Sequence, residues 1–161
     1  MDDAFTVDGE NYSELTVDEW ECVMSFHSWY QEMAPEIVAN EIVCYNETEG
    51  YAGTIDLLCK IEGQLFVVDV KTSQNVWPEH ELQVSAYCHC SADETPPLGA
   101  ILQVGYRKNK KRWKWTPLED KYPLFLAAKQ IWHAENDGVT PKQKDYPVEL
   151  TITRNGNAKD K

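Results

Sequence analysis

Apolar residues recur along the chain with two different periods, and each change of period predicts a boundary between a helix and a strand. Steps of three and four residues indicate an amphipathic helix, whereas alternation or a short β-branched run indicates a strand. Three helices are predicted, from Thr16 or Asp18 to about 33, over about 78–90 and over about 122–135. Five strands are predicted over about 38–45, 52–61 and 64–71, then over about 98–106, and over 112–116.

The predicted elements follow one another in the order α-β-β-β-α-β-β-α, which indicates an α/β protein with a central mixed β-sheet flanked by helices. The chain has 161 residues, of which 42% are hydrophobic, so it fits one domain with a single core. We therefore expect one domain over residues 1–161. Residues 1–14 are acidic and weakly patterned, and residues 154–161 read RNGNAKDK, so we expect both ends to be loose.

The first predicted helix carries an aromatic-rich stripe at three- and four-residue steps, and this side is expected to face the core. The stripe consists of Trp20, Val23, Met24, His27, Tyr30 and Gln31. Thr16 or Asp18 can cap the start of the helix, and Pro35 follows its end.

The second and third strands form a predicted hairpin that carries three charged residues in otherwise apolar surroundings. Its sequence, GTIDLLCKIEGQLFVVDVKTS, begins at Gly53 and has a two-residue turn at its Glu-Gly pair. The numbers of opposed residues then add up to 125, so Asp56 lies opposite Asp69, and Lys71 shares their face. A register slip of one residue would send Asp56 to the other face.

Two carboxylates opposed at roughly 5 Å between Cβ atoms repel each other, and the apolar strand LFVVDV also removes them partly from water. A divalent cation would compensate this charge, and carboxylate oxygens suit Mg²⁺ or Mn²⁺. The alternative is a structural ion pair between Lys71 and one aspartate. A zinc site from His80, Cys88, His89 and Cys90 has less support, since adjacent helix residues point in different directions.

The net charge of −12 hides one basic segment, YRKNKKRWKW over residues 106–115, which has six basic residues and no acidic one. The rest of the chain has 9 basic and 27 acidic residues. The basic side chains can bind phosphates, while Tyr106, Trp113 and Trp115 offer stacking platforms for bases. The alternative is a solvated turn whose aromatic residues face the core, because alternation sends Trp113 and Trp115 to one face.

Several features bear on the compartment of the protein. No run of about 18 apolar residues occurs, and the N-terminal MDDA lacks the basic-then-apolar order of a signal peptide. The odd number of cysteines and the lack of a CxxC pair favour reduced thiols over a disulfide framework. We therefore expect a soluble, cytoplasmic protein without membrane contact. The cysteines are Cys22, Cys44, Cys59, Cys88 and Cys90.

Three short motifs follow one another in the middle of the chain. They are GTID, which ends at Asp56, DVKTS, which begins at Asp69, and QVSAY, which ends at Tyr87. This series resembles the PD-(D/E)XK nuclease superfamily, and within it the RecB-like exonucleases of phage and repair systems. The resemblance extends over about 41–87 and implies a restriction-endonuclease-like core as the form of the predicted fold.

The resemblance assigns the charged residues of the hairpin to catalysis. It implies that Asp56 and Asp69 bind the catalytic Mg²⁺ or Mn²⁺, assisted by the backbone carbonyl of Val70. It also implies that Lys71 orients or activates the attacking water. A divalent ion polarises the scissile phosphate and lowers the pKa of its bound water, and a nearby ammonium stabilises developing negative charge.

Two residues compete for the role of a further ligand. A third acidic ligand normally precedes these motifs, and Glu41 is the candidate here; its alternative is a solvated acid at a strand edge. Some RecB-like members instead bring a histidine from the first helix, which makes His27 a candidate ligand. The alternative for His27 is a satisfied core histidine on the aromatic-rich stripe.

Gln83 and Tyr87 are four residues apart and share one face of the predicted second helix. The resemblance implies that both point toward the active site and the DNA strand, whereas the alternative is a Tyr87 that only faces the core. Binding to DNA is expected to be sensitive to salt. The other residues assigned to the substrate are Thr72, Arg107, Lys108, Lys110, Lys111 and Arg112.

The predicted function is that of a Mg²⁺- or Mn²⁺-dependent DNA exonuclease in replication, recombination or repair, which leaves a 5′-phosphate. No cysteine follows Cys90, so the iron–sulfur cluster of some relatives is not expected. The short chain favours a protein partner or self-association to grip DNA processively. The alternatives are a structure-specific endonuclease of the same fold and a non-catalytic acidic binding module.

Overall fold

Five strands form one mixed sheet in the computed structural model, which describes residues 6–7, 10–11, 15–90 and 95–139. Neighbouring strands are antiparallel except β5 and β6, which are parallel. The expected α/β class with a mixed sheet and flanking helices is therefore confirmed. The strands lie side by side in chain order: β3 (Glu36–Asn46), β4 (Tyr51–Ile61), β5 (Gln64–Lys71), β6 (Leu98–Val104) and β7 (Trp113–Leu118).

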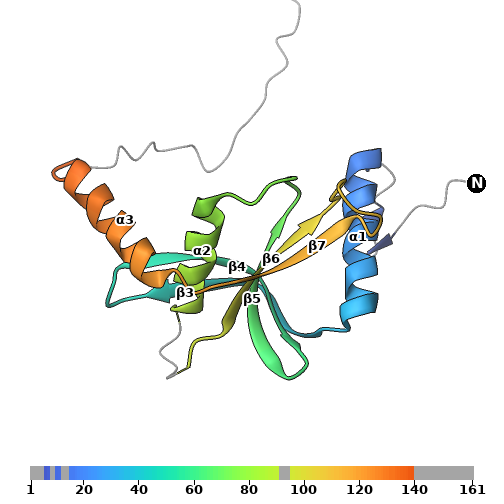
Figure 1. Ribbon diagram of the computed structural model, residues 1–161, viewed down its shortest axis with the longest axis horizontal. Coiled ribbons are helices and arrows are strands. Elements are labelled where there is room, and N and C mark those ends of the chain that lie inside the picture. Colours follow the sequence, from blue (N-terminus) through green and yellow to red (C-terminus); the bar gives the residue numbers. More distant parts are fainter. Residues whose placement is uncertain (1–5, 8–9, 12–14, 91–94, 140–161) are drawn as a thin grey trace, which may run out of the picture.

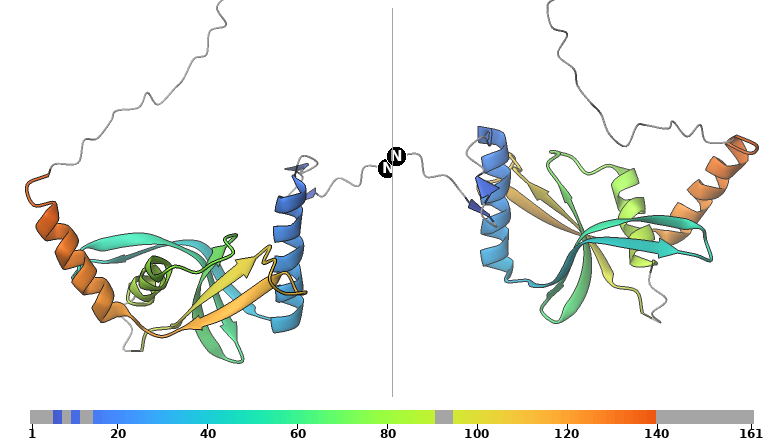
Figure 2. Two further views of the ribbon diagram at one scale, coloured as in Figure 1. Left: turned by 45° about the horizontal axis from the view of Figure 1, so that its top comes forward. Right: turned by 180° about the vertical axis from the view of Figure 1, so that it is seen from behind.

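Helices cover both faces of this sheet (Figure 1, Figure 2). On one face α1 (Val17–Met33) packs on β6 and β7, and on the other face α2 (Pro78–Cys88) packs on β5 and β6. α3 (Tyr122–Glu135) packs on α2 and reaches the β3–β4 hairpin, where Phe125 contacts Tyr51. None of the helices in the described ranges has the length and apolar content needed to cross a membrane.

The two ends of the chain are described only in part. Near the N-terminus, β1 (Thr6–Val7) and β2 (Glu10–Asn11) pair with each other as short antiparallel strands. The remaining residues of 1–14 and the expected loose end 154–161 lie outside the described residues.

The observed boundaries of the main helices and strands lie within two residues of the predicted ones. β5 and α3 have the predicted bounds, and β4 begins one residue earlier. α2 ends at Cys88 rather than Cys90, and β6 ends at Val104 rather than Tyr106. β3 is longer at both ends, and β7 extends to Leu118.

Local signals fix both ends of α1. The Thr16 hydroxyl accepts a hydrogen bond from the backbone N–H of Glu19 at 3.3 Å, and the Glu19 carboxylate accepts one from the backbone N–H of Thr16 at 2.7 Å. This capping box makes Thr16, not Asp18, the N-cap residue of α1. At the other end Ala34 adopts a left-handed φ of 44° and donates to the carbonyl of Tyr30 at 3.0 Å.

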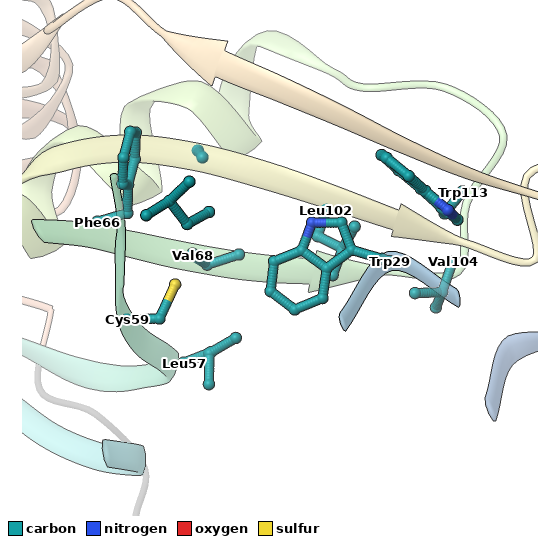
Figure 3. Packing of buried hydrophobic residues seen from close by; sticks show 10 residues of the cluster. Trp29, Leu57, Cys59, Phe66, Val68, Leu102, Val104 and Trp113 are labelled. Carbon is teal, nitrogen blue, oxygen red and sulfur yellow. The ribbon is translucent and has the colours of Figure 1, made fainter. Parts of the chain in front are cut away.

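Trp29 of α1 is the centre of the larger hydrophobic core, where side chains of β4, β5, β6 and β7 gather around it (Figure 3). It is fully buried and stacks on Trp115 with ring centroids 5.7 Å apart. Phe26 and Met33 pack against the same cluster. This contact fixes α1 against the sheet.

The prediction of which stripe of α1 faces the core is wrong. Met24 is 57% exposed, Tyr30 is 41% exposed and His27 is exposed as well. The core-facing stripe runs instead through Phe26 and Trp29, and both stripes have the same three- and four-residue steps. Periodicity alone could not separate the two stripes. Because its side chain is exposed, His27 is not a core histidine.

A second apolar cluster lies under α2 on the opposite face of the sheet. Val84 and Cys88 of α2 pack there against Ile55, Val67 and Ile101. Burial raises the pKa of the Cys88 thiol to about 12, so it stays protonated and behaves as a small apolar side chain.

The β4–β5 hairpin has the predicted turn and register. Its two turn residues, Glu62 and Gly63, have positive φ values of 51° and 80°, as a type I′ turn requires. The last backbone pair of the ladder is Leu57 opposite Val68, so opposed residue numbers do add up to 125. The register that sets Asp56 against Asp69 is thereby confirmed for the paired residues.

We expect Glu62→Asn to stabilise the protein by about 0.5–1 kcal/mol, because Asn tolerates left-handed φ better than Glu and Asn-Gly is a favoured type I′ pair. The matched variant Glu62→Val should destabilise it, since a β-branched residue is strained there. Urea denaturation measures both free energies of unfolding, and equal values for the two variants would contradict the turn conformation.

Candidate active site

The sheet opens between β4 and β5 at the place where Asp56 and Asp69 lie. The backbone pairs of these two fully described strands stop at Leu57 opposite Val68. β3 and β4 remain paired up to the tip of their hairpin, and β5 and β6 remain paired up to Lys71. Asp56 and Asp69 are the next residues on either side of the opening, so they face each other across it.

Asp56 uses its side chain where a strand would normally use its backbone. Its Oδ2 accepts a hydrogen bond from the backbone N–H of Val70 at 2.8 Å. The bond satisfies a donor that the interrupted ladder would leave without a β4 partner. Because Val70 directly follows Asp69, the bond also holds the Asp56 carboxylate against β5 close to Asp69.

Asp69 is a buried carboxylate with one satisfied and one unsatisfied oxygen. Its side chain is only 4% exposed, and Lys71 Nζ donates to Oδ1 at 2.8 Å. Oδ2 is buried and has no hydrogen-bond partner among the described residues. Burial raises the pKa of Asp69 above its ordinary value of 3.8; Lys71 opposes this shift, and the charge of Asp56 adds to it.

These residues fit a divalent cation. Two carboxylates against one ammonium leave an excess negative charge, and the unsatisfied Oδ2 of Asp69 is a hard oxygen of the kind that binds Mg²⁺ or Mn²⁺. Within residues 15–90 and 95–139, however, no three His, Cys, Asp or Glu side chains are grouped so that they could hold a metal ion. Asp56 and Asp69 are therefore the candidate side-chain ligands, and a role for the Val70 carbonyl stays a prediction.

Glu41 lies on β3 opposite Asp56. Asn40 pairs with Leu57 and Ile42 pairs with Ile55, which places Glu41 opposite Asp56. Its φ of 51° is left-handed, which is rare for a non-glycine residue inside a strand, and the residue is exposed. The structure thus brings Glu41 into register with Asp56 but does not group it with both aspartates, and its role as third ligand stays a prediction.

The other histidines considered as metal ligands have different surroundings. His27 is exposed on α1 and belongs to no metal-binding group in the described part of the chain. Its proposed role as a ligand gains no support from this position. His89, considered for zinc, lies 2.9 Å from a carboxylate oxygen of Asp120 through its Nε2 and stacks on Tyr122 with ring centroids 3.9 Å apart.

Tyr87 packs against the backbone of β4 so closely that only glycine fits at residue 53. A Cβ on Gly53 would lie 2.3 Å from Cε1 of Tyr87, far inside van der Waals contact. Gln83 Nε2 donates to the Tyr87 hydroxyl at 2.9 Å, so the predicted pair shares one helix face and makes contact. Tyr87 packs on the cluster under α2 and also lines an apolar cavity of about 740 Å³.

His80 is a neighbour of the site that the sequence singled out only for zinc. It lies in the first turn of α2, three residues before Gln83, and its charge lowers the pKa of Asp69. The backbone N–H of Trp77 donates to its Nδ1 at 3.4 Å. The spacing of His80 and Gln83 on one helix face is the signal that could have identified it.

The predicted phosphate-binding residues lie on the connection between β6 and β7, residues 105–112, here called the basic loop. This loop is not a free positive patch, because three of its cations form ion pairs with α1. Thr72 lies elsewhere, exposed and beside a cavity of about 560 Å³ that Arg107 also lines. The ion pairs are Arg107 with Asp18 at 2.7 Å, Lys111 with Glu32, and Arg112 with Glu21.

The remaining cations of the basic segment differ in their contacts. Lys108 Nζ donates to Asn75 Oδ1 at 2.9 Å, and Lys110 is exposed. Lys114 lies on β7, where its Nζ is 5.8 Å from the centroid of the Tyr106 ring.

Trp113 and Trp115 belong to the core, so the prediction that they offer stacking platforms is wrong. Trp113 is 6% exposed, and Trp115 packs between Trp29 and Phe66. Alternation along β7 sends both tryptophans to the face covered by α1, as the structural alternative predicted.

Two comparisons with known proteins identify no family for this chain. A scan against protein-family models returns no match, and a search of curated proteins returns no significant match. The functional argument therefore rests on the residues of the site.

We expect Gly53→Ala to destabilise the protein by about 1–3 kcal/mol, because the added Cβ overlaps the Tyr87 ring. Tyr87→Ala removes that ring and should make Gly53→Ala nearly neutral in its background. Urea denaturation of the two single variants and the double variant measures the coupling. Additive effects would show that Tyr87 does not pack on Gly53.

The raised pKa of Asp69 predicts a pH-dependent stability. Between 3.8 and the raised value, the folded state holds a proton that the unfolded state has lost, so this group makes stability fall as pH rises. In EDTA, Asp69→Asn should therefore gain free energy of unfolding relative to wild type as pH rises from about 4, and the difference should level off above the raised pKa. Urea denaturation across this range tests it, and a difference independent of pH would contradict the shift.

Proposed function

We propose that this chain is a metal-dependent nuclease of the PD-(D/E)XK kind that acts on DNA as an exonuclease. One observation carries the proposal: Asp56 and Asp69 face each other where β4 and β5 part, with Lys71 bound to one oxygen of Asp69 and the other oxygen unsatisfied. A structural ion pair accounts for the bond between Lys71 and Asp69. It does not account for the desolvated second oxygen of Asp69, which is buried without a hydrogen-bond partner among the described residues.

The arrangement of the sheet supports the same reading. β3, β4 and β5 form an antiparallel meander, and the crossover through α2 leads into parallel β6. The three sequence motifs fall on β4, β5 and α2, and α2 packs on both β4 and β5. Asp56 comes from β4, Asp69 and Lys71 come from β5, and Gln83 and Tyr87 come from α2.

Asp56 and Asp69 would hold Mg²⁺ or Mn²⁺. When bound, such an ion polarises a phosphodiester and lowers the pKa of its bound water. The residues of the chain prepare this chemistry in advance. Val70 anchors Asp56 through its N–H, and Asp69 anchors the Lys71 ammonium, which places a positive charge where negative charge develops on the phosphate.

The same opening suits a nucleic-acid strand. Net charge −12 repels DNA from most of the surface, so contact is favoured at the metal and at the basic loop. The hydroxyl of Tyr87 and the amide of Gln83 on α2 are bound to each other, and in this proposal they exchange that bond for one with a phosphate or base. The resemblance to this superfamily implies that hydrolysis leaves a 5′-phosphate.

The test is hydrolysis of linear and circular DNA with Mg²⁺, Mn²⁺ or EDTA. Wild type should degrade linear DNA alone and only with metal, Asp69→Ala should lose at least about 1000-fold in rate, and Lys71→Ala about 100-fold. Asp137→Ala, an exposed acid away from the opening, is the matched control and should keep full activity.

Other products would change the assignment. Cutting of circular DNA would make the protein an endonuclease of the same fold. No metal-dependent product from either DNA would overturn the nuclease proposal and leave a non-catalytic binding module. Stability in Mn²⁺ gives an independent readout: the melting temperature of wild type should rise, and that of Asp69→Ala should not.

A further inference from the structure

The basic loop is docked on α1 by ion pairs whose members are largely exposed. Arg107 is 57% exposed and its partner Asp18 is 76% exposed, while Arg112 and Glu21 are 37% and 34% exposed. Lys111 and Glu32 are about half exposed. Exposed ion pairs of this kind contribute little to the free energy of unfolding, so the fold does not depend on them.

The backbone of the basic loop is held by other bonds. The Gly105 N–H donates to the buried Ser25 hydroxyl at 2.8 Å, and the Arg107 N–H donates to Gln74 Oε1 at 2.7 Å. Asn109 accepts from the Arg112 N–H at 2.9 Å. The cationic side chains can therefore change partners while the loop keeps its shape.

The basic loop also begins beside the candidate active site. β5 and β6 run parallel with Lys71 opposite Gln103, so the chain enters the loop two residues past that pair. The segment that follows Lys71 is tied to the loop, since Gln74 donates to the Gly105 carbonyl at 3.0 Å and Lys108 donates to Asn75. A strand that enters the opening at Lys71 can continue along the loop.

We propose that the α1 carboxylates of Asp18, Glu21 and Glu32 act as built-in substitutes for phosphates, so that the basic loop is a nucleic-acid surface that α1 keeps neutral until DNA displaces it. This inference rests on the proposed function and deepens it. Three cations that face carboxylates at hydrogen-bond distance present a polyanion with partners of matching chemistry. DNA competes because it offers several phosphates at once.

Ion release gives this competition a measurable signature. Each cation that neutralises a phosphate of single-stranded DNA changes the slope of log K against log salt by about −0.7. When the cation must first leave a carboxylate, that carboxylate takes up an ion from solution and offsets the release. Removing the carboxylate should therefore steepen the slope, and not merely strengthen binding.

The experiment compares wild type with the double variant Glu21→Gln and Glu32→Gln in fluorescence anisotropy with a single-stranded oligonucleotide, in EDTA and over a range of salt. At low salt the variant should bind about tenfold more tightly, and its slope should be steeper by about 1. Circular dichroism checks that both proteins are folded.

A control separates this effect from a general change of charge. Glu47→Gln with Glu62→Gln removes the same charge from two exposed acids that form no ion pair in the described part of the chain. This pair should leave the slope unchanged. Adding Lys111→Gln and Arg112→Gln to the α1 double variant should abolish its gain.

The outcomes also separate the two proposals. An unchanged slope, an equal effect of the control pair, or no binding by either protein overturns the role of α1, whether or not DNA is hydrolysed. A steeper slope without any metal-dependent product supports the role of α1 in a binding module and overturns only the nuclease assignment.

Discussion

The hydrogen bond from the Val70 N–H to the Asp56 carboxylate is the interaction on which the arrangement of the site depends. At this point β4 and β5 exchange a rung of backbone pairing for a contact between backbone and side chain. A continued ladder would bond the Val70 N–H to the backbone of β4 and leave the Asp56 carboxylate without this anchor. A frayed end would leave their separation undefined. The bond keeps β4 and β5 close but unpaired, which is the condition for a site that is both open and fixed.

Several local penalties meet at this opening, and the rest of the domain compensates them. Asp69 is buried with one oxygen unsatisfied, and Glu41 is held at left-handed φ opposite Asp56. Either feature costs on the order of 1–3 kcal/mol. The packing around Trp29 fixes the strands from the other face of the sheet and makes the arrangement sustainable. Such a concentration of unfavourable features at one place is typical of sites selected for chemistry rather than stability.

The sequence predicted most clearly what short-range rules determine. Glu62 and Gly63 fixed the turn, the turn fixed the register, and the register placed Asp56 opposite Asp69. The stripe of α1 was beyond such rules, because two stripes have the same period and only contact with the sheet selects Trp29.

The partners of the basic loop were also outside the reach of the sequence. Arg107 and Asp18 are 89 residues apart, and no local pattern reports a pair at that separation. The missing rung between β4 and β5 likewise exists only in three dimensions, since nothing in the alternation of β4 marks Asp56 as the end of the pairing. The composition therefore suggested a free positive patch, while the fold neutralises much of it.

Five residue pairs join β4 to β5, and among the described strands this short ladder is the backbone pairing that links the β3–β4 ribbon to β5, β6 and β7. From Asp56 to Tyr51, β4 therefore makes no backbone pair with β5. α3 contacts the end of this ribbon that is away from the ladder, where the Phe125 ring packs against the Tyr51 ring. The contact between Phe125 and Tyr51 thus supports the ribbon on the side where β5 no longer pairs with it.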